Sequence, residues 1–296
     1  MTTTTFSVST NTSTDAAFRA AGSAINTAIL AVGIVQTSDT GQVNWTTITK
    51  PLTASTYAGY EMYRFNDSLQ STNPVYFKIS YYTNGYSTGQ GLNLYIQAGQ
   101  GTDGAGTLTG NVSSNLPVSN NSSGETATRA SYVSGSTNRL SMLLWPTTTM
   151  TNFWYVIGIE RTHDSSGADT SAGVYLFTAS YTSSGYSQYL PLGASTTLLP
   201  QAIGSGWYCS TPLSGSGTLS GNTYTYPIKT YSMTESLPCF NFLHYLSADI
   251  TTGTTVSITG YDGTSRNYYA SGLINSGTYF AYSGANSTTC LLMRYE

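Results

Sequence analysis

The sequence predicts an all-β protein, mainly antiparallel and sandwich- or jelly-roll-like, with one N-terminal helix. From Ile34 onward, apolar and polar residues alternate with a period of two, and turns rich in Gly, Asn and Ser separate the alternating runs. Tyr occurs 25 times, and Tyr, Thr, Val and Ile suit a pleated, half-buried surface. Aromatic residues at 13% and hydrophobic residues at 39% argue against a disordered chain, which lacks the side chains that offset ordering entropy.

The helix is expected between residues 12 and 33. Thr12, Ser13, Thr14 and Asp15 offer side-chain oxygens that can cap a first helical turn. Apolar residues then recur at steps of three and four, and Gly33 suits the C-terminal end. These residues are Phe18, Ala21, Ile25, Ala28, Ile29 and Val32. We expect the helix to pack on its own domain, whereas residues 1–13 could instead form an extended arm that pairs with a neighbouring subunit.

Period-two runs predict the strands. The expected strands are residues 60–65, 75–80, 92–96, 139–145, 153–161, 174–180, 224–231, 249–258, 267–273, 278–282 and 290–295. Residues 153–159 are almost continuously apolar, which indicates a central strand with both faces covered. We find no repeat of fixed period, which argues against a propeller or β-helix.

Three segments divide the chain. Residues 1–45 are interpreted as the N-terminal arm and helix, 46–213 as a β-sandwich domain, and 222–296 as a C-terminal β region that could belong to the same domain. A Gly- and Ser-rich stretch at residues 214–221 resembles a linker.

Charge excludes some classes of partner. Charged residues make up only 8% of the chain, against roughly 25% in ordinary globular domains, and the net charge is −3. No cluster of Lys and Arg is present to neutralise phosphates, so we expect no nucleic-acid partner. The most apolar stretch, residues 20–35, is too short and too interrupted to cross a bilayer, so we expect no membrane partner. A weakly charged surface suits a protein that packs against neighbours.

Candidate catalytic side chains are few. His163 lies beside Asp164 in a turn-like stretch, which suggests an exposed loop residue, and His244 lies in an apolar run, which suggests packing. Glu160 with Asp164 or Asp169 could serve as the acid pair of a glycan hydrolase, but an ion pair or cap at a strand end is the simpler interpretation. The spacing does not fit a calcium loop.

The chain contains three cysteines. Cys209, Cys239 and Cys290 have the spacing of neither a disulfide framework nor a zinc site, so buried free thiols are expected. We therefore predict no catalytic residue, no cofactor and no metal ligand.

Aromatic residues raise one further possibility. Trp207 and Tyr208, with a group of C-terminal tyrosines, could stack on sugar rings, although tyrosines equally line cores and subunit interfaces. The tyrosines are Tyr261, Tyr268, Tyr269, Tyr279 and Tyr282.

Several segments resemble a widespread family of virion-associated structural proteins of tailed bacteriophages. The segments are residues 15–24, 37–45, 58–67, 101–110, 159–162, 167–170 and 291–296, which together span nearly the whole chain. The resemblance implies a particle component and carries over no catalytic residue.

We therefore expect a non-enzymatic structural subunit of the virion, made in the cytoplasm of the host bacterium. The tail, baseplate or fibre apparatus is favoured over head decoration, and the expected partners are copies of the chain and other virion proteins. A receptor- or glycan-binding module that contacts host surface glycan is the alternative, and a glycan hydrolase is the second alternative.

Overall fold

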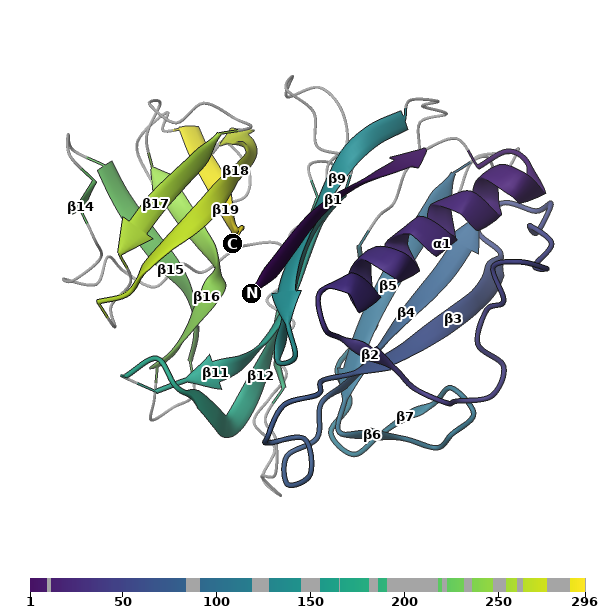
Figure 1. Ribbon diagram of the computed structural model, residues 1–296, viewed down its shortest axis with the longest axis horizontal. Helices are drawn as coiled ribbons and strands as arrows, with labels where there is room; N and C mark the ends of the chain where they lie inside the picture. The colour runs from purple at the N-terminus through teal and green to yellow at the C-terminus, as the bar shows by residue number, and fades with distance from the viewer. Residues whose placement is uncertain are drawn as a thin grey trace.

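The computed structural model describes most of the chain, and its regular structure consists of three large β-sheets, one two-stranded sheet and one helix. The described residues are 1–9, 12–83, 91–118, 128–144, 155–164, 166–180, 186–190, 218–219, 223–231, 236–246, 254–259, 263–275 and 288–295. Figure 1 shows a layered arrangement, in which a central sheet lies between a C-terminal sheet and a third layer that carries the helix. The predicted all-β class with one N-terminal helix is confirmed.

The central sheet has six strands and joins the N-terminus to the middle of the chain. Its strands are β1 (Thr2–Ser9), β9 (Thr128–Ser136), β10 (Arg139–Leu144), β11 (Tyr155–His163), β12 (Asp169–Ser180) and β13 (Tyr186–Leu190). They lie in the order β1-β9-β10-β11-β12-β13, and each pair is antiparallel. The segment before the helix is therefore a strand paired with β9 of its own chain.

A five-stranded sheet, called here the helix-side sheet, forms the layer next to the helix. Its strands are β2 (Val35–Gln36), β3 (Tyr57–Arg64), β4 (Tyr76–Thr83), β5 (Leu92–Gly99) and β8 (Leu116–Pro117), in that order across the sheet. A small hairpin of β6 (Gly101–Thr102) and β7 (Leu108–Thr109) packs against it, with Leu108 on Tyr60 and Met62.

The C-terminal sheet contains only strands from the last third of the chain. They are β14 (Thr218–Leu219), β15 (Thr223–Tyr231), β16 (Ser236–Leu246), β17 (Thr255–Thr259), β18 (Ser265–Asn275) and β19 (Thr288–Arg294). Their order is β14-β15-β16-β19-β18-β17, so the last strand lies inside the sheet. The C-terminus is thus held by neighbours on both sides.

Helix α1 (Asp15–Ala31) has the expected ends. The Thr14 side chain accepts a hydrogen bond from the Ala17 amide at 3.1 Å, and Gly33 follows the helix with φ of 98°. The predicted apolar face is buried, because it fills the space between the central and helix-side sheets (Figure 1).

Residues of β11 confirm the prediction of a central strand. Val156 and Ile157 point to opposite faces of the sheet, and both have no exposed surface. One face contacts the core shared with α1, and the other faces the C-terminal sheet, where β11 lies against β16. A strand covered on both faces has no position that requires a polar residue, which explains its apolar run.

Some strands differ from the prediction. The described strand near 249–258 begins only at Thr255, whereas β1, β9, β13, β16 and the two-residue strands were not predicted. The predicted strand at 278–282 lies outside the described residues, as do Cys209 and the side chains of Cys239, Cys290 and His244.

Candidate functional site

The few charged residues of this chain are drawn into its interior. Of 10 basic and 13 acidic residues, at least seven have buried side chains. These are Asp39, Lys50, Glu61, Glu160, Arg161, Arg266 and Arg294. Buried charges need partners, and for Glu61, Glu160 and Arg161 two clusters and one further ion pair among the described residues supply them.

The first group is called here the histidine cluster and consists of Glu160, His163 and Asp169. The His163 ring lies between two carboxylates, with Nε2 at 3.4 Å from Glu160 Oε2 and Nδ1 at 3.2 Å from Asp169 Oδ1. The register shifts between Arg161 and His163, and this bulge brings Glu160 and His163 to the same side of β11. His163 is paired with Asp169 across the β11–β12 ladder.

The charge of the histidine cluster follows from this geometry. Burial by itself lowers the pKa of His163, but contacts with the carboxylates of Asp169 and Glu160 outweigh it and raise the pKa. Each ring nitrogen faces a carboxylate, an arrangement that favours the imidazolium, which donates from both nitrogens. Arg139 Nη2 adds positive charge at 3.8 Å from Asp169 Oδ1.

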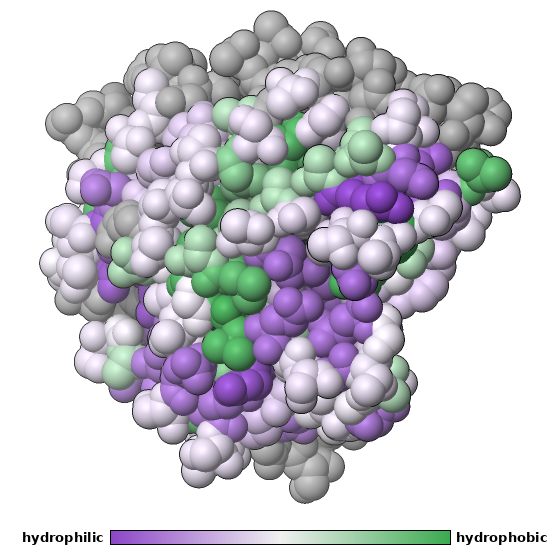
Figure 2. Space-filling model, turned by 45° about the vertical axis from the view of Figure 1, so that its right-hand side comes forward, coloured by the Kyte–Doolittle hydropathy of each residue, from purple (hydrophilic) through white to green (hydrophobic). Residues whose placement is uncertain are grey.

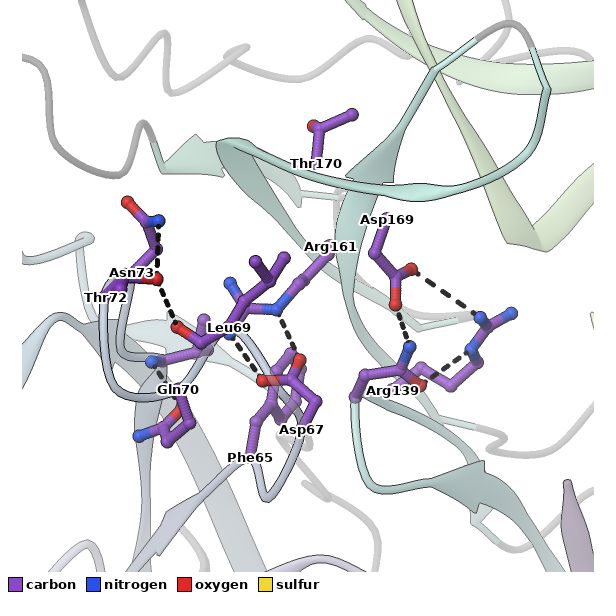
Figure 3. A network of polar contacts seen from close by, with 12 residues as sticks. Phe65, Asp67, Leu69, Gln70, Thr72, Asn73, Arg139, Arg161, Asp169 and Thr170 are labelled. Atoms are coloured by element: carbon purple, nitrogen blue, oxygen red, sulfur yellow. Dashed lines mark hydrogen bonds and ion pairs between the residues drawn. The ribbon is translucent and has the colours of Figure 1, made fainter.

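Asp169 takes part in a wider network that Figure 3 shows together with a second ion pair. Asn138 Nδ2 donates to Asp169 Oδ2, beside the Arg139 contact. Burial raises the pKa of Asp169, but His163 and Arg139 outweigh that effect and lower it. The carboxylate is therefore held ionised between two cations.

The second ion pair of Figure 3 joins Arg161 of β11 to Asp67, which follows β3. Arg161 Nε donates to Asp67 Oδ2 at 2.5 Å and Nη2 donates to Oδ1 at 2.9 Å, a two-pronged contact. The Arg161 side chain is fully buried, and its guanidinium carbon lies 5.6 Å from the centre of the Phe65 ring. This pair ties the central sheet to the helix-side sheet.

Asp164 is separate from the histidine cluster. Its Oδ1 accepts hydrogen bonds from the Ser166 amide at 2.8 Å and the Ala168 amide at 3.1 Å, so it stabilises the β11–β12 turn. Hydrogen bonds from Ser166 and Ala168 lower the pKa of Asp164. The interpretation of Asp164 as part of a turn is confirmed. The interpretation of His163 as exposed is wrong, because β11 extends two residues beyond the predicted strand end at Arg161 and His163 is 1% exposed.

The second group, called here the glutamate cluster, lies between α1 and the helix-side sheet and was not predicted. Glu61 is 1% exposed, and four neutral donors surround its carboxylate. The donors are Asn26 Nδ2 at 2.6 Å, Trp45 Nε1 at 2.8 Å, Tyr63 OH at 2.8 Å and Tyr81 OH at 2.5 Å. Burial raises the pKa of Glu61, against the opposing effect of these four hydrogen bonds. The cluster fastens α1 and the Trp45 loop to the sheet.

The two clusters are largely closed off from solvent. Glu160, His163 and Glu61 are each 1% exposed, whereas the Asp169 side chain is 24% exposed. Among the described residues, no three His, Cys, Asp or Glu side chains are placed to hold a metal ion. The described helix is not long and apolar enough to cross a membrane.

The tyrosines considered for sugar stacking separate into two groups. Tyr268 is buried, and the half-buried Tyr269 packs against Tyr132 of the central sheet and Tyr295 of the C-terminal sheet. The other candidates lie outside the described residues: Trp207, Tyr208, Tyr261, Tyr279 and Tyr282.

Three other tyrosines form a row on the outer face of the helix-side sheet. Tyr57, Tyr82 and Tyr95 come from neighbouring strands, with ring centres 5.2 Å and 5.0 Å apart in succession. Tyr57 is 46% exposed. The cross-strand register, Tyr57 opposite Tyr82, was the signal that could have revealed this row.

Segments that carry the phage-family resemblance contact one another in the fold. Asp39 accepts hydrogen bonds from Thr102 Oγ1 and, at 3.2 Å, from the Gly106 amide, which joins residues 37–45 to 101–110. The Asp67–Arg161 pair joins residues 58–67 to 159–162. Asp39, Asp67 and Arg161 of these segments therefore form their polar contacts within the chain.

Comparison of the chain with protein-family models, curated proteins and solved structures gave no match.

Proposed function

We propose that the chain is a structural component of a tailed-phage virion that acts by oligomeric assembly. Its place is the tail, baseplate or fibre apparatus rather than the head surface, and its partners are copies of itself and other virion proteins. The observation that carries the proposal is the burial of charged side chains. A chain with only 8% charged residues buries at least seven of them, and among the residues whose burial is described only Asp15, Asp103 and Asp164 are exposed charged residues.

This surface suits permanent contact with neighbours. Charged residues are depleted at the centres of protein interfaces because their desolvation is costly, whereas Tyr is enriched there. Figure 2 shows one side of the molecule on which pale, weakly polar residues and apolar patches cover much of the surface, with strongly hydrophilic residues gathered beside them. Low surface charge also gives little repulsion between copies.

The interior provides the rigidity that such a subunit needs. The Asp67–Arg161 pair and the glutamate cluster each bind two elements together, and the histidine cluster closes the end of β11 against β12. Their shared burial supports a structural role over a catalytic one.

Mass spectrometry of purified particles tests the proposal. We expect peptides of this chain in particles of the phage that encodes it, at a copy number that matches a symmetric ring or a repeated unit. Particles purified on a density gradient from cells infected with a phage lacking the gene provide the control. Absence of the chain from intact particles overturns the proposal.

The tyrosine row favours a second candidate, a module that binds host surface glycan. Partly exposed rings on a rigid sheet present apolar faces with hydroxyl groups at their edges, which suit sugar rings. Binding of the full-length chain to host polysaccharide, measured by calorimetry, should weaken at least tenfold in Tyr57→Ala and remain unchanged in Leu52→Ala, which removes another exposed side chain. Equal binding by both variants, or no binding by the folded wild type, removes this candidate.

A further inference from the structure

Three tyrosines, called here the inter-sheet tyrosines, meet between the central sheet and the C-terminal sheet. They are Tyr132 of β9, Tyr269 of β18 and Tyr295, which directly follows β19. The ring centre of Tyr132 lies 4.5 Å from that of Tyr269 and 5.7 Å from that of Tyr295. Thr5 of β1 pairs with Tyr132 across the ladder, and its hydroxyl lies 3.4 Å from the Tyr295 hydroxyl. Strands from the beginning, middle and end of the chain therefore meet at these rings.

Tyr132 and Tyr269 have a geometry that the tyrosine row does not share. Their ring planes are 31° apart, whereas Tyr57 and Tyr82 are inclined by 59° and Tyr82 and Tyr95 by 65°. Burial raises the pKa of Tyr269, and a hydrogen bond with the Tyr132 side chain adds to this effect. The hydroxyl-bearing ends of the two rings therefore lie side by side. The ring carbons next to those ends, which are the carbons ortho to the hydroxyls, are brought together as well.

We propose that Tyr132 and Tyr269 form a site of oxidative cross-linking, at which a bond between their ortho carbons joins the central sheet covalently to the C-terminal sheet. Each phenol gives one electron to an oxidant and its hydroxyl proton to water, which leaves two tyrosyl radicals. The radicals couple through one carbon–carbon bond. The hydrogens of the two bonded carbons then leave as protons, and the two phenol oxygens take up protons again. The net loss is two electrons and two protons.

The oxidant belongs to the class of one-electron acceptors, metal complexes in their higher oxidation state. Two equivalents are needed, and each is reduced by one electron. Tyr132 and Tyr269 are both half-buried, so a small oxidant reaches the rings while the two sheets hold them in place. Tyr63 and Tyr81 of the glutamate cluster also have neighbouring hydroxyls, but both are fully buried and are closed to such an oxidant. Tyr132 and Tyr269 combine adjacency with access.

The cross-link would fix the C-terminal sheet on the central sheet. It would close a loop of more than a hundred residues between β9 and β18, and a covalent link across a long loop restricts the unfolded chain. The melting temperature should rise by roughly 5–10 °C. The reaction needs only the folded chain and the oxidant, so it can succeed or fail independently of the virion assignment.

Photo-oxidised tris(bipyridyl)ruthenium, a one-electron acceptor, tests the inference on the full-length chain at neutral pH. Peptide mass spectrometry should find the peptide with Tyr132 joined to the peptide with Tyr269, with a mass two hydrogen atoms below their sum. Tyr269→Phe keeps the ring but removes the phenol, and it should lower the yield of this product at least tenfold. Tyr82→Phe makes the same change in the tyrosine row and should leave the yield unchanged.

Two measurements on wild type need no variant. The Tyr132–Tyr269 product should be lost when the chain is oxidised in concentrated urea, because only the fold brings these rings together. Calorimetry of the cross-linked, purified monomer should show the higher melting temperature. The inference is overturned if the product is absent, if links within the tyrosine row form at a lower dose of oxidant, or if urea leaves the yield unchanged. An equal yield in Tyr269→Phe and Tyr82→Phe, or an unchanged melting temperature, would also contradict it.

Discussion

Removing one partner of the Asp67–Arg161 pair should be among the most destabilising single changes in this chain. The Arg161 side chain is fully buried, and its Nη1 has no hydrogen-bond partner among the described residues, so the Asp67 carboxylate supplies the partner atoms for the other guanidinium nitrogens. In Asp67→Asn the guanidinium stays buried without its counter-charge. Loss of one member of a buried pair costs about 3–5 kcal/mol. At about 2 °C per kcal/mol for a chain of this size, the melting temperature should fall by about 6–10 °C.

A matched surface change and a double variant distinguish the cost of an unpaired buried charge from the cost of substitution in general. Asp15 forms a longer, more exposed contact with Arg19 at 3.9 Å, so Asp15→Asn should cost less than about 1 kcal/mol. Arg161→Met combined with Asp67→Asn removes both charges and should recover about half of the lost stability. Differential scanning calorimetry at pH 7 measures all three. The reasoning is wrong if Asp67→Asn melts within 2 °C of Asp15→Asn, a difference of about 1 kcal/mol.

Two other changes follow from the clusters. Gly22→Ala places a Cβ against the Trp45 ring, and overpacking of this kind should lower the free energy of unfolding by about 1–3 kcal/mol. Urea unfolding followed by tryptophan fluorescence measures this loss. Ser23→Ala, on the exposed side of the helix, is the control and should change the free energy of unfolding little. The pKa of His163 is raised in the folded state, so its stabilising contacts with Glu160 and Asp169 are fully present below about pH 6.5 and lost as the pH rises through the folded value. The difference in melting temperature between wild type and His163→Gln should therefore shrink from pH 6 to pH 9, and a constant difference would contradict the raised pKa.

The sequence contained enough information to predict the helix and most of the apolar strands. Phe18 and Ile25 recur with helical spacing, and the apolar run from Val156 to Ile159 indicates a doubly covered strand, because in both cases the local pattern reflects burial. Strand β1 was not predicted, because Thr and Ser show no alternation between apolar and polar residues. Its pairing with β9 depends on a partner more than a hundred residues away.

The buried clusters could not be predicted for a related reason. Glu61 reads as a polar residue on an alternating strand, and four donors from separate elements decide that it is buried rather than exposed. An irregular register between Arg161 and His163 accompanies the approach of His163 to Glu160, and a strict period of two would have put these side chains on opposite faces. These contacts depend on which distant residues the folded chain brings together, and composition does not determine that.

The position of β1 also constrains how the protein is made. The ribosome makes β1 more than a hundred residues before its partner strand β9, and the Thr5 hydroxyl lies 3.4 Å from the Tyr295 hydroxyl across 290 residues. The central sheet therefore cannot close while the ribosome is still translating its early strands, and sequence-distant pairing of this kind slows folding. Until closure, the uncharged Thr-rich segment of β1 lacks its partner strand β9, and unpaired strands of this kind are prone to aggregate with other chains.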